Sequence, residues 1–244
     1  VWVLGDHHVT IIDPASPYKD EQARLDEILE MVLVERIVLT HHHHDHIGGV
    51  TAIQEATGAR IAAHALTRDR VKFAVDEILC DGDVVGTDAG FWKVLHTPGH
   101  APGHICLFNG GLSTLVAGDM VAGEGTILLD PPEGNLGEYI ASLERLLALQ
   151  PDRILPAHGP VISPGSVCLE QYIAHRQMRS EQILAMLAGT NGMTAAQIAD
   201  EIYAEQVPKQ FLGVAARQVL CHLLSLEERG LTCRDGDTFH VVSP

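Results

Sequence analysis

The sequence predicts an α/β protein of two unequal units, with histidine-rich segments placed where strands end. Short apolar runs alternate with amphipathic helical patterns through the first half of the 244 residues. Histidines or aspartates follow four of the predicted strands. Beyond a break at Gly189–Gly192, two helical patterns precede a closing hairpin. We therefore expect a larger unit in residues 1–188, which includes a long linking helix, and a smaller unit in residues 189–244.

The first elements lead directly to a cluster of histidines. Val9–Ile12 is strand-like and stops at a proline, which cannot donate to a sheet ladder. Apolar residues then repeat at helical spacing, which predicts an amphipathic helix over about residues 20–33. Arg36–Thr40 follows as a buried strand, and a Gly-Gly pair after the histidines opens another helix that ends near Thr57. The strand over Arg36–Thr40 therefore delivers the histidines from its C-terminal end.

The middle of the chain contains short strand patterns separated by turns of glycine, proline or aspartate. The expected strands are Arg60–Ala63, Val84–Val85, Phe91–Leu95, Ile105–Phe108 and Thr114–Ala117. A loop rich in glycine and proline covers Gly118–Gly137, and loops of that length are usually functional or disordered. The larger unit is completed by a helix over Glu138–Leu149, a strand over Arg153–Leu155 and a histidine loop over Pro156–Pro160.

The remaining elements predict a helical module with a terminal hairpin. A long helix is expected over Val167–Leu187, followed by helices over about Thr194–Ala204 and Val214–Glu228. Leu231–Arg234 and Thr238–Val242 flank an Asp-Gly-Asp turn, which predicts a hairpin. Helices followed by such a wing resemble a small winged-helix domain.

The charge of the chain limits its partners. Lysine and arginine number 16 against 32 for aspartate and glutamate, so the net charge is −16. A field of that sign repels polyanions and counts against duplex DNA as a partner. The module after Gly189 has four basic residues against seven acidic ones, so we interpret it as a packing or dimerising cap rather than a reader of nucleic acid.

Composition and the first residues also indicate where the protein is located and whether the N-terminus is missing. No apolar run reaches the roughly 18 residues of a membrane-spanning helix, so no membrane is expected. Five scattered cysteines without a CxxC pair favour a reducing, cytoplasmic compartment. Because the chain begins at Val1 inside a strand-like run, we expect that N-terminal residues, and with them any targeting signal, are missing.

The strongest chemical signal is the run His41-x-His43-x-Asp45-His46, which comes directly after a predicted strand. Side chains two positions apart in an extended segment project the same way, so His41 and His43 can hold one ion. Asp45 and His46, further round the turn, can face a second ion. Neutral imidazole suits zinc, and a carboxylate adds a harder oxygen ligand.

Three further segments supply matching side chains. His100 closes a Thr-Pro-Gly turn, Asp119 ends a strand where its carboxylate can bridge two ions, and His158 lies in the histidine loop. Five histidines and two aspartates suffice for two ions with a position left open for water, which is typical of a catalytic site. A histidine-rich surface loop or a purification tag is the plain alternative, but Asp45 interrupts the run and a Gly-Gly pair follows it.

Taken in order, the motifs T-H-x-H-x-D-H-x-G-G, T-P-G-H, G-D and the His158 loop resemble the metallo-β-lactamase superfamily. That resemblance implies an αβ/βα sandwich with two metals at one sheet edge, and Asp13 matches its aspartate that supports the metal loop. The ligand sets it implies are His41, His43 and His100 for the first metal, Asp45, His46 and His158 for the second, and Asp119 for both.

A narrower resemblance covers nearly the whole chain. It rests on the winged-helix tail and on the segments Gly123–Thr126, His158–Ile162, Gln171–Arg176 and Arg179–Leu184. These are similar to the β-lactamase-like protein 2 family, whose members include a single-strand-specific endoribonuclease and thioesterases that act on carrier-bound acyl chains.

Two functions remain open at this level. Both use a hydroxide that bridges the two metals, with Asp45 and Asp119 as the carboxylates of the catalytic centre. The first is a phosphodiesterase that cleaves single-stranded RNA. The second is a thioester or ester hydrolase acting on a small molecule, like glyoxalase II (hydroxyacylglutathione hydrolase) or an acyl-carrier thioesterase. Zinc is the expected metal, although these ligands also accept manganese and iron, and a homodimer is compatible with either function.

Several side chains are candidates for supporting roles. His104, at the start of a predicted core strand, either orients substrate or a ligand carboxylate, or is structural. His175 lies in a helical pattern and is a candidate for contact with substrate. Basic residues available for phosphate contacts, if they do not simply form a solvated face, are Arg68, Arg70, Lys72, Arg176 and Arg179.

Overall fold

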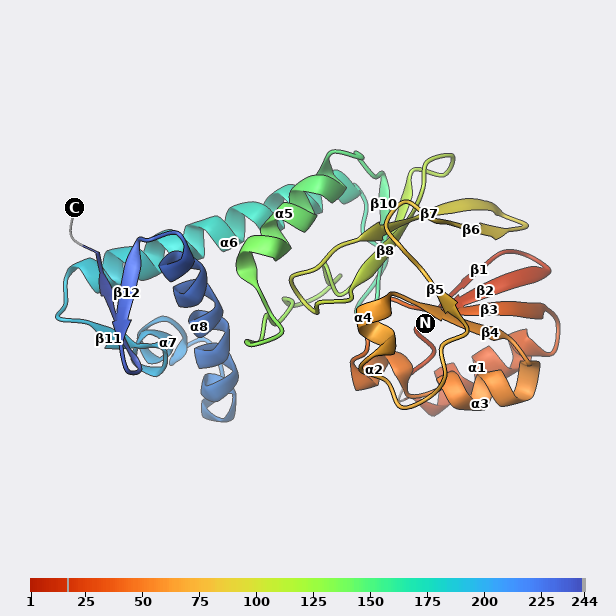
Figure 1. Cartoon of the computed structure of the whole chain (residues 1–244), viewed down its shortest axis with the longest axis horizontal. Coiled ribbons are helices and arrows are strands. Elements are labelled where there is room, and N and C mark those ends of the chain that lie inside the picture. The colour runs from red at the N-terminus through yellow and green to blue at the C-terminus, as the bar shows by residue number, and fades with distance from the viewer. Residues whose placement is uncertain (17, 243–244) are drawn as a thin grey trace.

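The computed structural model describes residues 1–16 and 18–242, and it contains two sheets packed face to face with helices outside them (Figure 1). The first sheet, in spatial order, consists of β1 (Trp2–Leu4), β2 (His8–Ile12), β3 (Leu33–Leu39), β4 (Arg60–Ala63) and β5 (Glu77–Ile78). The second sheet, in spatial order, consists of β10 (Arg153–Pro156), β9 (Thr114–Gly118), β8 (Ile105–Asn109), β7 (Gly90–His96) and β6 (Val84–Thr87). The predicted α/β sandwich is confirmed.

Alternation along the strands of the first sheet explains its two packed faces. Ile12 and Val38 contact the second sheet, whereas Ile37, one position from Val38, belongs to the opposite face. That outer face packs against α1 (Lys19–Leu29) and α3 (Val50–Thr57). Because β2, β3 and β4 are parallel, their C-terminal ends share one edge of the sheet.

The outer face of the second sheet is covered by α5 (Leu136–Leu147) and α6 (Gly165–Ala188). Tyr139 and Leu143 on α5 are fully buried against the sheet. Burial of a side chain of this size contributes about 1.5–3 kcal/mol to the free energy of folding. The layer order is thus helix, sheet, sheet, helix, as the resemblance implied.

A small module follows α6, which extends from the sandwich into it (Figure 1). Its elements are β11 (Met193–Thr194), α7 (Ala195–Tyr203), the 3-10 turn η1 (Lys209–Phe211), α8 (Leu212–Glu228), β12 (Thr232–Asp235) and β13 (Thr238–Val241). The last residues of α6, including Ile183 and Leu187, share a core with Ile198 and Phe239 of the module. The predicted winged-helix architecture is confirmed, and a boundary at Gly189 stays a prediction.

Some local expectations differ from the structure. The first helix ends at Leu29 rather than near residue 33, because Leu33 begins β3 and its N–H donates to the carbonyl of His7 at 2.8 Å. The short helix α4 (Ala65–Arg68) and the strand β5 were not predicted. Cys106 and Cys221 are buried free thiols. Among residues 1–16 and 18–242, no helix combines the length and apolar character needed to cross a bilayer.

Candidate metal centre

Strand ends from both sheets bring the predicted ligand side chains to one edge of the sandwich. β3 ends at Leu39 and continues into the histidine segment, whose last part forms the short helix α2 (His44–Ile47). The parallel neighbours β9 and β10 end at Gly118 and Pro156, so the segments that follow them start side by side. All seven predicted ligands meet in overlapping groups there: His41, His43, Asp45, His46, His100, Asp119 and His158.

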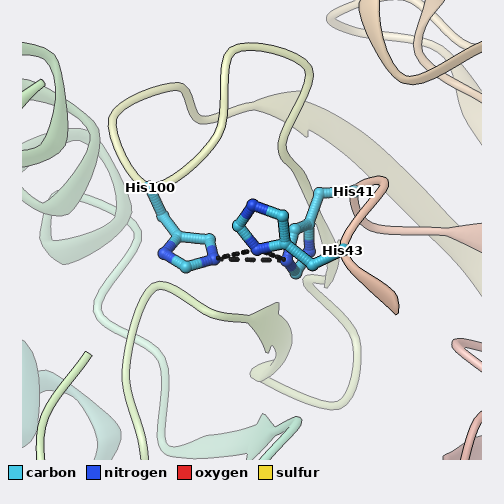
Figure 2. Close-up of side chains that lie close together, drawn as sticks. All are labelled: His41, His43 and His100. Atoms are coloured by element: carbon cyan, nitrogen blue, oxygen red, sulfur yellow. Dashed lines mark hydrogen bonds between the residues drawn. The ribbon is translucent and has the colours of Figure 1, made fainter. Parts of the chain in front are cut away.

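Three histidines form the first half of this cluster (Figure 2). His43 Nδ1 lies 3.0 Å from His41 Nε2 and 3.0 Å from His100 Nε2, and the two Nε2 atoms are 3.2 Å apart. Nitrogen ligands of a tetrahedral zinc ion, each about 2.0–2.1 Å from the metal, lie about 3.4 Å from one another. The three nitrogens are therefore spaced much like atoms that share one cation.

Hydrogen bonds on the far sides of these rings decide which nitrogens carry protons. Thr40 Oγ1 donates to the carboxylate of Asp13 at 2.6 Å, so the same oxygen accepts the proton of His41 Nδ1 at 3.0 Å. His100 Nδ1 donates to the carbonyl oxygen of Leu128 at 2.9 Å. The Nε2 atoms of His41 and His100 therefore carry lone pairs that face each other, which a cation between them would stabilise.

Carboxylates and two more histidines form the second half. Asp119 Oδ2 lies 3.4 Å from His100 Nε2, whereas its Oδ1 lies 3.4 Å from both His46 Nε2 and His158 Nε2. Asp45 Oδ2 lies 3.4 Å from His158 Nε2 and 3.8 Å from His46 Nε2. Among the described residues, His46 Nε2 and Asp119 Oδ1 are buried without a hydrogen-bond partner. The two oxygens of Asp119 thus face the two halves of the cluster, as those of a bridging ligand would.

Asp13 supports the histidine segment from the end of β2. Its Oδ1 accepts the N–H of Thr40 at 2.8 Å, and its Oδ2 accepts the Nδ1 proton of His46 at 2.9 Å. A carboxylate in this position fixes the orientation of the ring and leaves Nε2 free for a metal. The parallel register places Ile12 opposite Val38, and this pairing brings Asp13 beside Thr40. The contact matches the supporting role that the resemblance implied.

His104 acts on the backbone of the cluster. Its ring is fully buried just before β8, and its Nε2 accepts the N–H of Asp119 at 3.0 Å. The ring proton therefore lies on Nδ1, which donates to Thr97 Oγ1 at 2.9 Å. Gly118 is required beside it, because a Cβ there would lie 2.5 Å from His104 Nε2 and because its φ is +49°. Of the roles considered for His104, positioning a ligand carboxylate fits this geometry.

Burial holds two histidines of the first half, His41 and His100, in their uncharged form. Burial lowers the pKa of His100 to about 4, and burial lowers the pKa of His41 well below its ordinary value. Both imidazoles are therefore uncharged near pH 7, which is the form that binds a metal.

The carboxylate-rich half stabilises positive charge. The carboxylates of Asp119 and Asp45 beside its ring raise the pKa of His158 to about 9. Burial opposes the charged form of His46, but the negative charges of Asp13 and Asp119 outweigh it and raise the pKa to about 10. A divalent cation would supply this positive charge in place of protons. Both halves therefore fit divalent cations.

Glu133 is a functional candidate that sequence analysis missed. It belongs to the active-site loop, defined here as residues 119–135 between β9 and α5. Its Oε2 lies 3.1 Å from His42 Nε2 and 3.5 Å from His43 Nε2, and its Oε1 accepts from Arg70 Nε at 3.2 Å. Glu133 thus holds the outer side of the ring whose Nδ1 faces the cluster. No motif marks it, and its place in a long Gly/Pro-rich loop was the only signal.

Two residues singled out from the sequence lie away from the cluster. His175 is exposed on α6, and within the described part of the chain it forms no hydrogen bond or ion pair with the seven residues. Arg176 is buried, and its guanidinium donates to the carbonyl of Ile127 in the active-site loop. The expectation that Arg176 could contact phosphates is therefore wrong, because its charge is enclosed by protein.

A cavity of about 420 Å³ opens directly onto the cluster. His43, Asp45, His100 and Asp119 of the cluster line it. The other lining residues are Leu128, Asp130, Pro131, Pro132 and Glu133 of the active-site loop and Arg217 from α8. The winged-helix module therefore contributes a side chain to the cavity that would receive a substrate.

Two family models match the chain. One is described as the metallo-beta-lactamase superfamily and matches residues 1–158. The other is described as the beta-lactamase associated winged helix domain and matches residues 194–240. Their order agrees with the sandwich and the C-terminal module of the structure.

Several curated proteins are similar in sequence. A beta-lactamase-like protein 2 homolog of Drosophila melanogaster is 34% identical over 243 residues, which cover 91% of this chain and 80% of the relative. A hydroxyacylglutathione hydrolase of Aeromonas hydrophila is 35% identical over 64% of this chain and 58% of its own length. An atrochrysone carboxyl ACP thioesterase of Claviceps purpurea is 29% identical over 74% of this chain and 60% of its own length.

Solved structures share the fold across both units. A metallo-beta-lactamase family protein from Thermus thermophilus has a TM-score of 0.80 and 24% identity, covering 98% of this chain and 92% of its own. A beta-lactamase domain protein from Burkholderia ambifaria has a TM-score of 0.83 and 22% identity, covering 99% of this chain and 86% of its own. At these identities the likeness concerns the fold alone.

Proposed function

We propose that this chain, which belongs to the metallo-β-lactamase superfamily, is a dinuclear metal-dependent hydrolase of thioesters or related activated esters. The observation that carries the dinuclear assignment is the placement of Asp119. One of its oxygens faces His100, and the other faces His46 and His158, with all three separations at 3.4 Å. A carboxylate between two sets of nitrogens is suited to bridging a pair of cations.

Each half of the cluster supplies ligands for one ion. Asp119 would supply an oxygen to each ion through the two carboxylate oxygens that face the two halves. The remaining ligands would be His41, His43 and His100 for the first ion and Asp45, His46 and His158 for the second. When bound, the ions would lower the pKa of a water molecule toward neutrality and polarise the bond that it attacks. Zinc is the proposed metal, because imidazoles outnumber carboxylates, while manganese or iron would also accept this ligand set.

The protein's own groups then orient the reactants and move a proton. Asp45 is the most accessible carboxylate of the cluster, with 58% of its side chain exposed. Its hydrogen bond with His158 lowers the pKa of Asp45 to about 2, so it is ionised at neutral pH. We assign Asp45 to accept the proton of the attacking water. Asp119 would hold the two halves of the cluster at a fixed separation, and its backbone is fixed because its N–H donates to His104.

The charge of the cavity favours a small acyl substrate over a polyanion. Four carboxylates line it, from Asp45, Asp119, Asp130 and Glu133, and the one arginine or lysine among the described lining residues is Arg217. Binding of a nucleic-acid strand generally requires several cationic contacts along the backbone. The printed names of two relatives, a hydroxyacylglutathione hydrolase and an ACP thioesterase, support the same substrate class.

Arg217 would bind an anionic group of such a substrate. It donates to Asp130 and to the carbonyl of Pro131 through Nε and Nη2, and its side chain is half exposed at the cavity wall. A guanidinium has five N–H groups, so others stay available for a carboxylate. The arrangement suits an acyl thioester whose carrier bears a negative charge at the end remote from the scissile bond.

Cleavage of single-stranded RNA is the second candidate. It is supported by similarity over 91% of the chain to a β-lactamase-like protein 2 homolog. The family that the sequence resembles has an endoribonuclease among its members. Arg70 does not line the cavity, but it contacts Glu133 of the cavity lining and would then add to Arg217 for phosphate contacts. A homodimer and a cytoplasmic, reducing location stay predictions.

The two candidates separate in one set of assays. The purified protein, loaded with zinc, is tested on S-lactoylglutathione, an acyl-CoA and a single-stranded RNA, beside His43→Ala and Asp119→Ala. We expect thioester turnover that both variants lose. RNA cleavage that depends on His43 and Asp119, with no thioester turnover, would overturn the thioester assignment and favour the second candidate. Absence of all three activities at saturating zinc would contradict both.

A further inference from the structure

The helix α8 contacts the active-site loop through one of its faces. Gln218 Oε1 accepts the N–H of Leu129 at 2.9 Å, and Arg217 Nη2 donates to the carbonyl of Pro131 at 3.1 Å. One turn further along, Cys221 Sγ lies 3.6 Å from the carbonyl oxygen of Gly134. The module therefore holds the loop over residues 129–134.

The contact from Gln218 continues to the metal centre through a single peptide group. The carbonyl of Leu128 and the N–H of Leu129 belong to the same planar unit. That carbonyl accepts the Nδ1 proton of His100 at 2.9 Å, while the N–H donates to Gln218 at 2.9 Å. Rotation of this peptide plane would break both hydrogen bonds, so the bond at the Leu129 N–H also fixes the direction of the Leu128 carbonyl.

Burial makes the relay difficult to replace with water. Gln218 is 8% exposed, Leu129 is fully buried, and His100 is 7% exposed. If a buried N–H loses its acceptor, water cannot replace that acceptor, so the peptide must shift until the N–H meets another partner. Hydrogen bonds in series also polarise one another, so the Gln218 acceptor strengthens the bond that Leu128 makes to His100.

We infer that Gln218 is a positioning residue for His100, and that the winged-helix module thereby forms part of the metal centre. The chain of contacts runs from Gln218 Oε1 to the Leu128–Leu129 peptide, then to His100 Nδ1, and leaves His100 Nε2 aimed at His41 and His43. The expected effect on metal binding rests on the proposed metal site, whereas the positioning of the His100 ring rests on the hydrogen bonds alone. Loss of the acceptor at position 218 lets His100 rotate and weakens binding of the ion that it shares with His41 and His43.

The test compares Gln218→Leu, which removes the acceptor, with Gln218→Glu, which keeps one. Gln206→Leu is the matched control, because Gln206 lies in the same module and its Nε2 donates to the carbonyl of Ile202 at 2.7 Å within the module itself. Gln218→Met, close in length and without an amide, replaces Gln218→Leu if that variant does not fold.

Two readouts are measured on each variant. The first is the Nδ1 proton of His100 in ¹H–¹⁵N spectra of the metal-free protein, and the second is the zinc affinity by chelator competition. For Gln218→Leu we expect a displaced or exchange-broadened Nδ1 signal and zinc affinity about tenfold weaker, since partners of metal-binding histidines typically contribute 10- to 100-fold. Gln218→Glu should stay within about threefold of the wild type, and Gln206→Leu should match it.

An unchanged Nδ1 signal together with wild-type zinc affinity in Gln218→Leu or Gln218→Met would overturn the inference. A loss of affinity of the same size in Gln206→Leu would also overturn it, because the effect would then reflect general loosening of the module. If the wild type binds no metal, the proposed function fails, and the Nδ1 signal of His100 still decides whether Gln218 positions that ring.

Discussion

Replacing Asp13 by asparagine removes one negative charge and one acceptor from behind the metal centre. The carboxylate accepts the N–H of Thr40 at 2.8 Å, the hydroxyl of Thr40 at 2.6 Å and the Nδ1 proton of His46 at 2.9 Å. An amide has a single oxygen, so in either orientation its NH₂ group faces a donor. Asparagine is the right probe because Asp13 has a φ of 48°, which asparagine tolerates and most other side chains do not.

The size of the effect follows from the charge-assisted bond to His46. A hydrogen bond to a charged group contributes about 1.5–3 kcal/mol. At about 1.4 kcal/mol per factor of ten, loss of the bond weakens binding of the second ion by about tenfold to 150-fold. The assay is chelator competition with zinc, read beside kcat/KM on the thioester that the protein hydrolyses best. We expect both quantities to fall together, since His46 holds the ion that catalysis requires.

The matched control is Asp88→Asn. Asp88 is also an aspartate with several hydrogen bonds, since it accepts the N–H groups of Asp6, His7 and His8, but none of these belongs to the metal cluster. The reasoning is refuted if Asp13→Asn keeps zinc affinity within twofold of the wild type while the circular dichroism of the folded chain is unchanged.

Three further changes give separable results. Arg217→Ala should raise KM for an anionic thioester roughly tenfold with little change in kcat, because a bond from a charged donor contributes about 1.5 kcal/mol; an equal loss in kcat would contradict a role in substrate binding alone. Burial, aided by nearby arginines, lowers the pKa of His222 from 6.5 to about 3. Between these pH values the unfolded chain binds a proton that the folded chain does not, so the free energy of unfolding falls as pH falls from 6.5 toward 3, by about 2 kcal/mol at pH 5. Urea unfolding of His222→Gln should show a shallower fall. The prediction is refuted if the free energy of unfolding depends on pH in the same way in the wild type and in His222→Gln. Tyr139→Phe removes the buried donor that bonds the carbonyl of Met120 at 2.6 Å, so the free energy of unfolding should fall by about 1–3 kcal/mol in guanidinium titrations, whereas an unchanged midpoint would show that the carbonyl finds another partner.

The meeting of the candidate ligands at one edge was predictable because their signal is local or lies at strand ends. The run from His41 to His46 is dense in ligand side chains, and Asp119 and His158 each follow a short apolar run closely. Since parallel strands end at a common edge, ordering these segments was enough to expect that they converge. The structure brings these side chains together in overlapping groups of three, and their roles as metal ligands stay a prediction.

The supporting contacts were not predictable in the same way. Glu133 reaches His42 across 91 positions of sequence, and Gln218 reaches Leu129 across 89. Nothing in the local pattern around either residue distinguishes it from other polar side chains of a loop or helix. Such partners depend on how α8 and the active-site loop pack, which is set by the tertiary fold and not by spacing along the chain.

Arg176 was expected on an exposed face and is buried instead. Its helical position among other charged residues suggested a solvated face, but α6 lies against the active-site loop there and encloses the guanidinium. Position 176 falls on the one stripe of buried residues along α6, between Ile173 and Ser180, so the spacing of the apolar residues already placed this side chain on the covered face.

The measurement that bears most directly on this account is the number of metal ions bound per chain. Purified protein is saturated with zinc, freed of excess metal by dialysis, and analysed by mass spectrometry of the intact folded chain and by elemental analysis. We predict two ions per chain in the wild type and at most one in Asp119→Ala. A folded wild-type chain that holds a single ion, or none, would contradict a centre in which Asp119 serves two cations.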